Sequence, residues 1–376
     1  MTRTRVLIAG LGDSGLLTAM HLAGRRDLEV VGVSVKPGLV SGQELGTRLA
    51  RPDDWARDYR IGFDRYRRLD RVRRIHGELT GLDLVAREVT VRTYADEVVA
   101  EPWDVLVVAT GVTNGFWRRP DLQGEDEVAA ELAATHARLA GSDSILVVGG
   151  GAAAVSSAFQ LALTWPEKEV ALAFPGERAL PRHHPRAWHH VEARLRAAGV
   201  VLLPGRRAVL PEGFRADRIT AGPVDWSGGQ EPHAADAVVW AIGRVRPNTG
   251  WLPAELLDDE GFVRTDSTLQ APEHPEVFAI GDVAATDPLR SSARGRADRL
   301  LARNIGAHLD DLPMREFTPP RNRWGSVLGV EPDGLRVFAP SGRPFRFPAW
   351  SVERVLQPWI VRRGIYGGVR HLRHLL

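Results

Sequence analysis

The chain has 376 residues, of which 44% are hydrophobic and 26% are charged, and it contains no cysteine. The absence of cysteine excludes a disulfide framework, a thiolate nucleophile, a cysteine-bound iron–sulfur cluster and a CxxC redox centre. The chain has 49 basic and 47 acidic residues, and this near-neutral charge balance argues against a dedicated nucleic-acid-binding protein. The length suits two or three packed units.

No apolar run suggests export or membrane insertion. The first run, Val6–Ala9, ends in glycines and is too short for the core of a signal peptide. Nothing approaches the roughly 20 apolar residues that a membrane-spanning helix needs. We therefore expect a cytoplasmic protein.

The chain begins with a βαβ pattern. The apolar run Val6–Ala9 is typical of a buried parallel strand, and a glycine-rich turn at 10–15 follows it. An apolar-periodic helix is expected from Leu16 to Leu22, and a second strand from Glu29 to Val35. A glycine turn between an apolar strand and a helix is typical of a dinucleotide site.

Each glycine of this turn has its own predicted role. Gly10 allows the tight turn, Gly12 lets a phosphate approach the backbone, and Gly15 lets the helix pack closely on the strand. The acidic residue expected at the end of the second strand, where it would hold the adenosine ribose, is replaced by Ser34. A serine hydroxyl can bond a ribose hydroxyl, though more weakly than a carboxylate.

The same pattern recurs later in the chain and predicts a second nucleotide site. A strand at Ile145–Val148 leads into a turn at 149–154, a helix to Leu163 and a strand ending at Phe174. An alanine replaces the third glycine of this turn, which is a known variant of the motif.

The end of that second strand carries Phe174 in place of an acid. A nucleotide site that lacks this acid and has an arginine nearby can accommodate the 2′-phosphate of NADP. Arg178 and Arg182 lie close enough in sequence to contact such a phosphate, and solvated loop arginines are the alternative interpretation.

Three further apolar strands end in a glycine, at 103–111, 237–244 and 276–282. A hairpin-like region at 77–99 precedes the first of them. From about residue 313 the sequence changes to short β-like runs broken by proline and glycine, which predicts a third, smaller unit.

These motifs, in this order, resemble the two-dinucleotide-binding-domain flavoproteins, also called pyridine nucleotide-disulfide oxidoreductases. The resemblance covers residues 3 to about 308 and includes the motif Val107-Val108-Ala109-Thr110-Gly111 and the motif Val277-Phe278-Ala279-Ile280-Gly281-Asp282. Without a dithiol, the chain is similar to the cysteine-free branch: apoptosis-inducing-factor-like proteins, ferroptosis suppressor protein and type II NADH:quinone reductases.

The resemblance implies an α/β fold with two Rossmann-like domains, FAD as cofactor and NAD(P)H as co-substrate. The FAD-binding domain would comprise 1–113 and 245–312, with the NAD(P)H-binding domain inserted at 114–244. Residues 313–376 would form a C-terminal interface or acceptor-side domain.

The resemblance also assigns site residues by position. Asp282 would accept hydrogen bonds from the ribityl chain of the flavin, with a turn-capping aspartate as the alternative. A glutamate that the family places near the nicotinamide is replaced by Ser156, so a slow or degenerate coenzyme site is a further alternative. The expected FAD contacts are Gly10, Gly12, Ser14, Gly15, Ser34, Lys36, Arg48, Leu79, Thr110, Gly111, Gly281 and Asp282; the expected coenzyme contacts are Gly149, Gly151, Ala152, Ala153, Arg178 and Gly243.

Three other clusters carry weaker predictions. The histidines at 183, 184, 189 and 190 match no common ligand spacing, so no metal is expected. The six arginines of 65–74 could dock an acidic protein such as a ferredoxin, but a solvated helix face is favoured. The basic, aromatic C-terminal segment 350–376 would suit a membrane surface. Pro358 and Gly364 should break any long amphipathic helix there, and packing against the flavin domain or a second subunit is favoured.

The sequence therefore predicts an FAD-dependent NAD(P)H oxidoreductase. It would pass a hydride from NAD(P)H to FAD and then electrons to a quinone or other small acceptor, without a dithiol relay. The alternatives are a ferredoxin reductase and a low-turnover, flavin-bound redox sensor or assembly protein. No acid–base residue is assigned.

Overall fold

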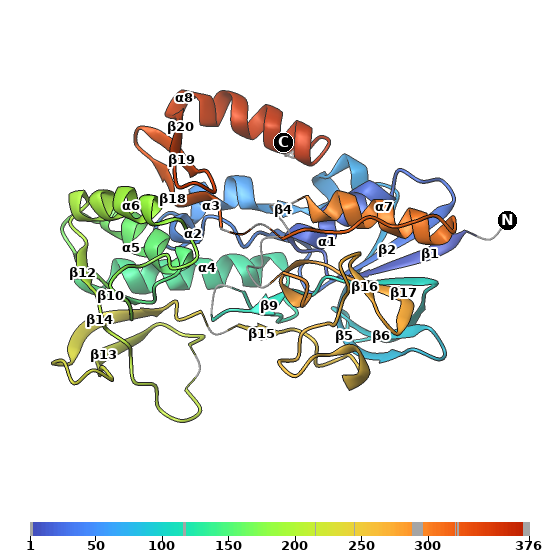
Figure 1. The fold of residues 1–376 in the computed structure, drawn as a ribbon, viewed down its shortest axis with the longest axis horizontal. Helices are drawn as coiled ribbons and strands as arrows, with labels where there is room; N and C mark the ends of the chain where they lie inside the picture. Colours follow the sequence, from blue (N-terminus) through green and yellow to red (C-terminus); the bar gives the residue numbers. More distant parts are fainter. Residues whose placement is uncertain are drawn as a thin grey trace.

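The structure is a computed structural model that describes residues 3–115, 118–214, 216–243, 245–287, 296–319, 321 and 323–370. Two sheets form its framework and stand in the two halves of the molecule (Figure 1). The predicted α/β fold is confirmed.

The first sheet has eight strands in the order β16-β17-β8-β1-β2-β5-β6-β7. Strand β1 pairs in parallel with β2 and with β8, and β17 joins β8 in parallel, so four strands end at one edge. The long strand β5 begins parallel to β2 and continues into an antiparallel meander with β6 and β7. The strands are β1 (Thr4–Ala9), β2 (Leu28–Ser34), β5 (Val72–Asp83), β6 (Glu88–Thr93), β7 (Val98–Pro102), β8 (Val105–Val108), β16 (Gln270–Ala271) and β17 (His274–Ala279).

The central strand β1 is apolar because both faces of the sheet are covered there. Val6, Leu7 and Ile8 are fully buried. On one face, α1 (Asp13–Leu22) packs beside α7 (Ala297–Leu309), which share one core cluster. The predicted first βαβ unit and the helix near residue 300 are therefore confirmed.

The second sheet has five strands in the order β12-β11-β10-β14-β13, all parallel except β13. Helices α5 (Ala152–Thr164) and α6 (Pro185–Ala197) contribute to the core cluster on one face, and the repeat of the βαβ pattern is confirmed. The strands are β10 (Ser144–Val148), β11 (Glu169–Ala173), β12 (Val201–Leu203), β13 (Thr220–Val224) and β14 (His233–Trp240).

The remaining elements complete the body of the molecule. They include two small antiparallel pairs, three helices and four single 3₁₀ turns. They are β3 (Gly38–Val40) with β4 (Arg60–Gly62), β9 (Val112–Thr113) with β15 (Arg246–Pro247), α2 (Leu45–Ala50), α3 (Pro52–Tyr59), α4 (Glu125–Ala140), η1 (Phe63–Arg65), η2 (Arg67–Leu69), η3 (Ala254–Leu256) and η4 (Gly281–Val283).

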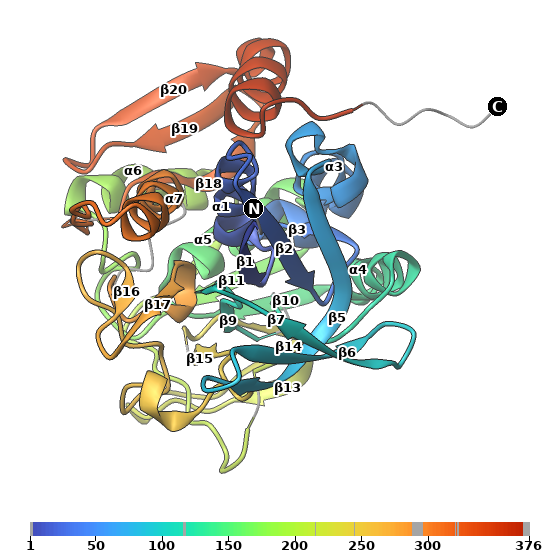
Figure 2. The same ribbon diagram turned by 90° about the vertical axis from the view of Figure 1, so that its right-hand side faces the viewer.

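The C-terminal residues form a layer of their own at the top of Figure 2. An antiparallel sheet of β18 (Gly325–Glu331), β19 (Gly334–Phe338) and β20 (Pro344–Pro348) leads into α8 (Ala349–Ser351) and the helix η5 (Val352–Ile365). The sheet shares a core cluster with α5 and α6 through Val327, Leu328 and Phe338. The predicted smaller β-rich unit is confirmed.

The helix η5 corrects one expectation, because it continues through Pro358 and Gly364. It has wide, π-type turns, and the Tyr366 N–H donates to the carbonyl of Val361, five residues back. An α-helical proline crowds the carbonyl four residues back, and a wider turn relieves that crowding.

The arginine-rich segment 65–74 corrects another expectation. It forms the turns η1 and η2 and the start of β5, where a solvated helix face was expected. The arginines of this segment alternate with the buried residues Tyr66, Leu69 and Val72, because the chain lies along the surface of the core. Among the described residues, no helix combines the length and apolar character that a membrane span requires.

Candidate functional site

A cavity of about 1100 Å³ lies at the carboxyl edge of the parallel strands of the first sheet. The turns after β1, β2, β8 and β17 all reach it, which is where ligands bind in open α/β sheets. The start of α5 reaches the same cavity from the second sheet, and residues near β18 close it from the C-terminal sheet.

Most of the predicted site residues line this cavity. The predicted residues that line it are Gly10, Gly12, Ser14, Ser34, Lys36, Arg48, Leu79, Thr110, Gly111, Ala152, Ala153, Gly281 and Asp282. The predicted residues outside its lining are Gly15, Gly149, Gly151, Arg178 and Gly243.

The glycines of the first turn differ in the space around them: two are required by close packing, and one borders open space. Gly10 has a φ of 104°, and a Cβ on Gly15 would lie 1.9 Å from the carbonyl oxygen of Gly10. A Cβ on Gly12, in contrast, would meet nothing within 4 Å. The turn thus leaves open backbone at the N-terminus of α1, which is the geometry that suits a phosphate group.

The second glycine turn likewise has one glycine in close packing and one that borders open space. Gly149 has a φ of 146°, and its Cβ would lie 2.1 Å from the carbonyl oxygen of Ala241, whereas a Cβ on Gly151 would meet nothing within 4 Å. Helix α5 starts at the next residue, so its free backbone N–H groups face outward at this point. A second anion can be held there.

Lys36 is hydrogen-bonded to the segment 121–123, which also lines the cavity. Its Nζ donates to the backbone oxygen of Asp121 at 2.6 Å and to the side-chain oxygen of Gln123. Burial lowers the pKa of Lys36 to about 8. Burial also lowers the pKa of Arg48 to about 10, and its guanidinium lies 5.1 Å from the centre of the Trp55 ring.

Arg118 is a cavity residue that the sequence reasoning missed. Its guanidinium forms an ion pair with Asp282, the predicted ribityl partner, and lies where a side chain on Gly42 would stand. Burial opposes the charge of Arg118, but Asp282 and Asp13 outweigh it and raise the pKa. Arg118 belongs to a loop without a recognisable motif, so no local signal could have identified it.

Ser156 occupies a tight helix–helix contact. Its hydroxyl is buried without a hydrogen-bond partner among the described residues, and it lines the cavity. A Cβ on Gly46 of α2 would lie 2.2 Å from the carbonyl oxygen of Ser156 and 2.4 Å from its Oγ. This close approach of α2 to α5 leaves room for a serine at the position where the family usually has a glutamate.

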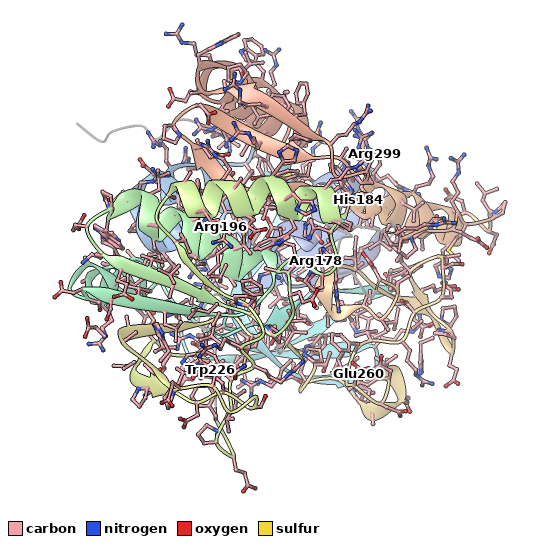
Figure 3. All side chains as sticks on the ribbon, turned by 60° about the vertical axis from the view of Figure 1, so that its left-hand side comes forward. Arg178, His184, Arg196, Trp226, Glu260 and Arg299 are labelled. Atoms are coloured by element: carbon pink, nitrogen blue, oxygen red, sulfur yellow. The ribbon has the colours of Figure 1, made fainter. Side chains whose placement is uncertain are left out.

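Arg178 lies below the start of α6, near His184 (Figure 3). Its guanidinium donates to the backbone oxygens of Leu180 at 3.2 Å, His183 at 3.4 Å and Pro181 at 3.4 Å. These bonds direct Arg178 into its own loop. The preceding Phe174 is buried in the core, so the strand end offers no side chain to a ribose.

The neighbouring histidines are divided among different environments. His183 is buried, His184 accepts a hydrogen bond from the Arg186 N–H at the start of α6, and His189 and His190 are exposed. The part of the chain that the structure describes holds no group of three histidine, cysteine or acidic residues arranged for a metal ion.

The arginine-rich segment 65–74 contributes several internal ion pairs. Arg73 pairs with Glu101 at 2.5 Å, and Arg65 donates to the backbone oxygen of Arg370 at 3.0 Å. Arg370 in turn pairs with Asp70 at 2.5 Å, so the segment around Arg370 is held against this segment. The exposed arginines of the segment are at 67, 68, 71, 73 and 74.

Comparison with known proteins identifies the family. A family model described as pyridine nucleotide-disulphide oxidoreductase matches residues 4–301. Fe-regulated protein 8 of Mycosarcoma maydis is 30% identical over 201 residues, which cover 52% of this chain and 49% of that protein. The chain thus aligns with about half the length of this relative.

Two further proteins agree with that assignment. The type II NADH:quinone oxidoreductase NdhA of Mycobacterium tuberculosis is 27% identical over 350 residues, covering 78% of this chain and 69% of NdhA. The water-forming NADH oxidase of Lactobacillus brevis, solved with NADH bound, superposes with a TM-score of 0.66 at 18% identity. That superposition covers 89% of this chain and 74% of the oxidase and shows a shared fold.

These matches bear out the predicted family, and family membership supports FAD as cofactor and NAD(P)H as co-substrate. They also agree with the glycine turns, the strand order and the cavity described above. The chain therefore belongs to the pyridine nucleotide-disulphide oxidoreductase family.

Proposed function

We propose that this chain is an FAD-dependent NAD(P)H oxidoreductase that reduces a quinone or another small acceptor. One observation carries the proposal: the first glycine turn at the N-terminus of α1 and the first turn of α5, which follows the second glycine turn, line a single cavity. A flavin held at the first turn and a nicotinamide held at the second would meet inside it.

The residues present fit FAD. Gly12 offers open backbone to a diphosphate, and the cations Lys36, Arg48 and Arg118 line the cavity and match its negative charge. Leu79 of β5 lines the cavity, which suits an adenine ring, and Asp282 lines it from η4, the turn that follows β17.

When bound, FAD supplies the chemistry of hydride acceptance and electron release. The chain's own residues orient the partners and exclude water. Arg118 and Asp282 hold opposite charges in the cavity wall, and Thr110 and Gly111 line the cavity in the turn after β8. Ser156 gives the coenzyme side a neutral hydroxyl in place of a carboxylate.

The acceptor has to meet the flavin directly because the chain has no cysteine for a dithiol relay. The cavity extends to Trp324, Ser326 and Val327, at and just before β18, so the C-terminal sheet would form the acceptor side. The likeness to a quinone oxidoreductase supports a quinone as acceptor. The domain division at 1–113 with 245–312, 114–244 and 313–376 is part of the same proposal.

A ferredoxin reductase is the second candidate, and one observation favours it. Arg67, Arg68, Arg71 and Arg74 are exposed on one segment and would suit an acidic protein. A low-turnover redox sensor or assembly protein is the third candidate, motivated by Ser34, Phe174 and Ser156 standing where acidic residues are expected.

The C-terminal layer has an exposed surface that could contact a membrane or a second subunit. Large apolar side chains are exposed on the C-terminal layer, among them Trp350 at 62% and Trp359 at 57%. With Arg354 and Arg363 beside them, they would suit a peripheral contact with an anionic membrane. A homodimer through the same layer is the alternative.

The acceptor is identified by reoxidation. The flavin of the FAD-loaded protein is first reduced with excess coenzyme, and a soluble quinone or a ferredoxin is then added at low and at high salt. We expect the quinone to reoxidise the flavin at a rate that salt changes little. Fast reoxidation by ferredoxin alone, strongly weakened by salt, would replace the first candidate with the second. Failure of both acceptors favours the third.

A further inference from the structure

The two sheets are joined by two crossings of the chain. The first crossing leaves β8 and reaches the second sheet through β9, and the second returns from β14 through β15. The two crossings pair with each other, with Arg246 opposite Thr113 and Pro247 opposite Val112. In Figure 1 they run through the middle of the molecule, between the two sheets.

Asn248 fastens these crossings to each other with four hydrogen bonds. Its backbone N–H donates to the oxygen of Gly111 at 3.0 Å, and its backbone oxygen accepts from Thr110 Oγ1 at 2.8 Å. Its side-chain Nδ2 donates to the oxygen of Thr110 at 3.0 Å, and its Oδ1 accepts from Thr113 Oγ1 at 2.7 Å. These partners lie 135 to 138 residues away in sequence.

The chemistry of the side chain explains why an amide stands here. The position needs one donor, facing the Thr110 carbonyl, and one acceptor, facing the Thr113 hydroxyl. An amide supplies both on a planar group. An aspartate of the same shape would present a negative oxygen to the Thr110 carbonyl and would repel it.

The four hydrogen bonds of Asn248, which we call the Asn248 clasp, lie where the two cofactors should meet. Thr110, Gly111 and Asn248 all line the cavity, beyond the carboxyl end of β8. Hydride transfer requires the reacting atoms to lie about 3 to 3.5 Å apart, and a displacement of about 1 Å can lower the rate 100-fold. A change in the relative position of the two crossings would therefore change the distance between the reacting atoms.

We propose that Asn248 is a positioning residue that sets the approach of the nicotinamide to the flavin by holding the two crossings together. This inference rests on the proposed hydride transfer from NAD(P)H to FAD. Because these four hydrogen bonds include backbone groups of both crossings, they act on the relative placement of the two nucleotide sites.

The test compares Asn248→Ala and Asn248→Asp with Thr249→Val as the matched control. Thr249 is the next residue, is buried, and donates one hydrogen bond to the oxygen of Gly261 at 2.8 Å, outside the clasp. Three quantities are measured: the rate of anaerobic flavin reduction at saturating coenzyme, the Kd for FAD, and backbone hydrogen exchange at 109–115 and 245–250 in the FAD-free protein.

For both Asn248 variants we expect the reduction rate to fall about tenfold or more, while the Kd for FAD stays close to that of the wild type. Hydrogen exchange should accelerate in both segments, and Thr249→Val should change neither the rate nor the exchange. An unchanged reduction rate in Asn248→Ala, or an equal fall in Thr249→Val, overturns the proposal.

The exchange measurement separates this inference from the proposed function. If neither NADH nor NADPH reduces the wild-type flavin, the proposed function fails, and the clasp is then judged by exchange alone. Equal exchange in Asn248→Ala and the wild type in that case overturns the clasp as well.

Discussion

At the scale of single residues, the ammonium group of Lys36 is partly buried and therefore poorly solvated. Burial lowers its pKa from the usual 10.5 to about 8, so the folded state releases a proton at a lower pH than the unfolded state. Stability rises with pH wherever the unfolded state binds more protons. The buried charge therefore destabilises the folded protein below pH 8, and this effect disappears as the pH rises from 8 to 10.5.

Substitution of Lys36 by methionine should remove this pH dependence. We expect the free energy of unfolding of the wild type to rise relative to that of Lys36→Met between about pH 8 and pH 10. Urea unfolding of both proteins across this range measures the difference. Parallel pH profiles for the two proteins would show that Lys36 does not titrate there.

The glycines of the first turn give a matched pair. A methyl group on Gly12 enters open space, so Gly12→Ala should keep the thermal stability of the wild type and lose FAD affinity by about tenfold or more. A methyl group on Gly15 overlaps the Gly10 carbonyl, so Gly15→Ala should lower the free energy of unfolding by about 3 kcal/mol. Calorimetry and FAD titration check the pair, and an unchanged FAD affinity in Gly12→Ala would argue against a phosphate at this turn.

At the scale of elements, a buried carboxylate joins the C-terminal sheet to helix α6. Glu331 of β18 has a fully buried side chain and accepts from Arg194 Nε of α6 at 2.7 Å and from Arg336 Nη1 of β19 at 2.9 Å. Asp333 also pairs with both arginines, at 2.8 Å from Arg336 and 3.7 Å from Arg194, so the loss of Glu331 leaves each arginine with one acidic partner. Breaking a buried ion pair costs about 3 kcal/mol at the lower end of the usual range.

We therefore expect Glu331→Ala to lower the free energy of unfolding by about 3 kcal/mol, because two arginines would lose a shared partner. Denaturant titration measures this loss. Arg346→Ala is the control, since Arg346 pairs with Asp333 at the exposed margin of the same network and should cost less than about 1 kcal/mol. Equal costs for the two variants would contradict the role of Glu331.

The sequence predicted elements that local patterns determine. An apolar run, a glycine turn and a periodic helix lie within some twenty residues at each nucleotide fold, so β1, α1, β10 and α5 could be identified from neighbouring residues. The cavity lining could be anticipated for the same reason, since Gly12 and Ser34 follow directly on predicted strands.

Features built from distant residues could not be predicted. Arg118 meets Asp282 and Asn248 meets Thr110 across more than a hundred residues, and no local pattern marks such pairs. The segment 65–74 has an alternation that suits either a helix face or a chain lying on the core. Pro358 was expected to end a helix because wide turns are rare.

At the scale of the whole molecule, the C-terminal layer presents an apolar and basic surface. Trp350, Trp359 and Ile360 are exposed there, with Arg354 and Arg363 alongside. The end of the chain is fastened to the body by Arg362 with Asp58, at 2.7 Å, so this surface has a fixed place on the molecule. Aromatic and basic side chains on one face suit the interface of an anionic membrane.

We expect the protein to sediment with vesicles that contain anionic lipid and to stay in solution with neutral vesicles. The double substitution of Trp350 and Trp359 by serine should weaken the binding, because the apolar contact is lost. Val209→Ser is the control, since Val209 is 52% exposed and lies outside the C-terminal layer. Equal loss in both variants, or a dimer that dissociates in the tryptophan variant, would favour another role for this surface.

The central claim concerns the direction of electron flow through one cavity, from NAD(P)H to a bound flavin. The most direct measurement is anaerobic mixing of the FAD-loaded protein with NADH and, separately, with NADPH, followed through the visible absorbance of the flavin. We expect at least one coenzyme to bleach the flavin within minutes. A flavin that stays oxidised with both coenzymes would contradict it.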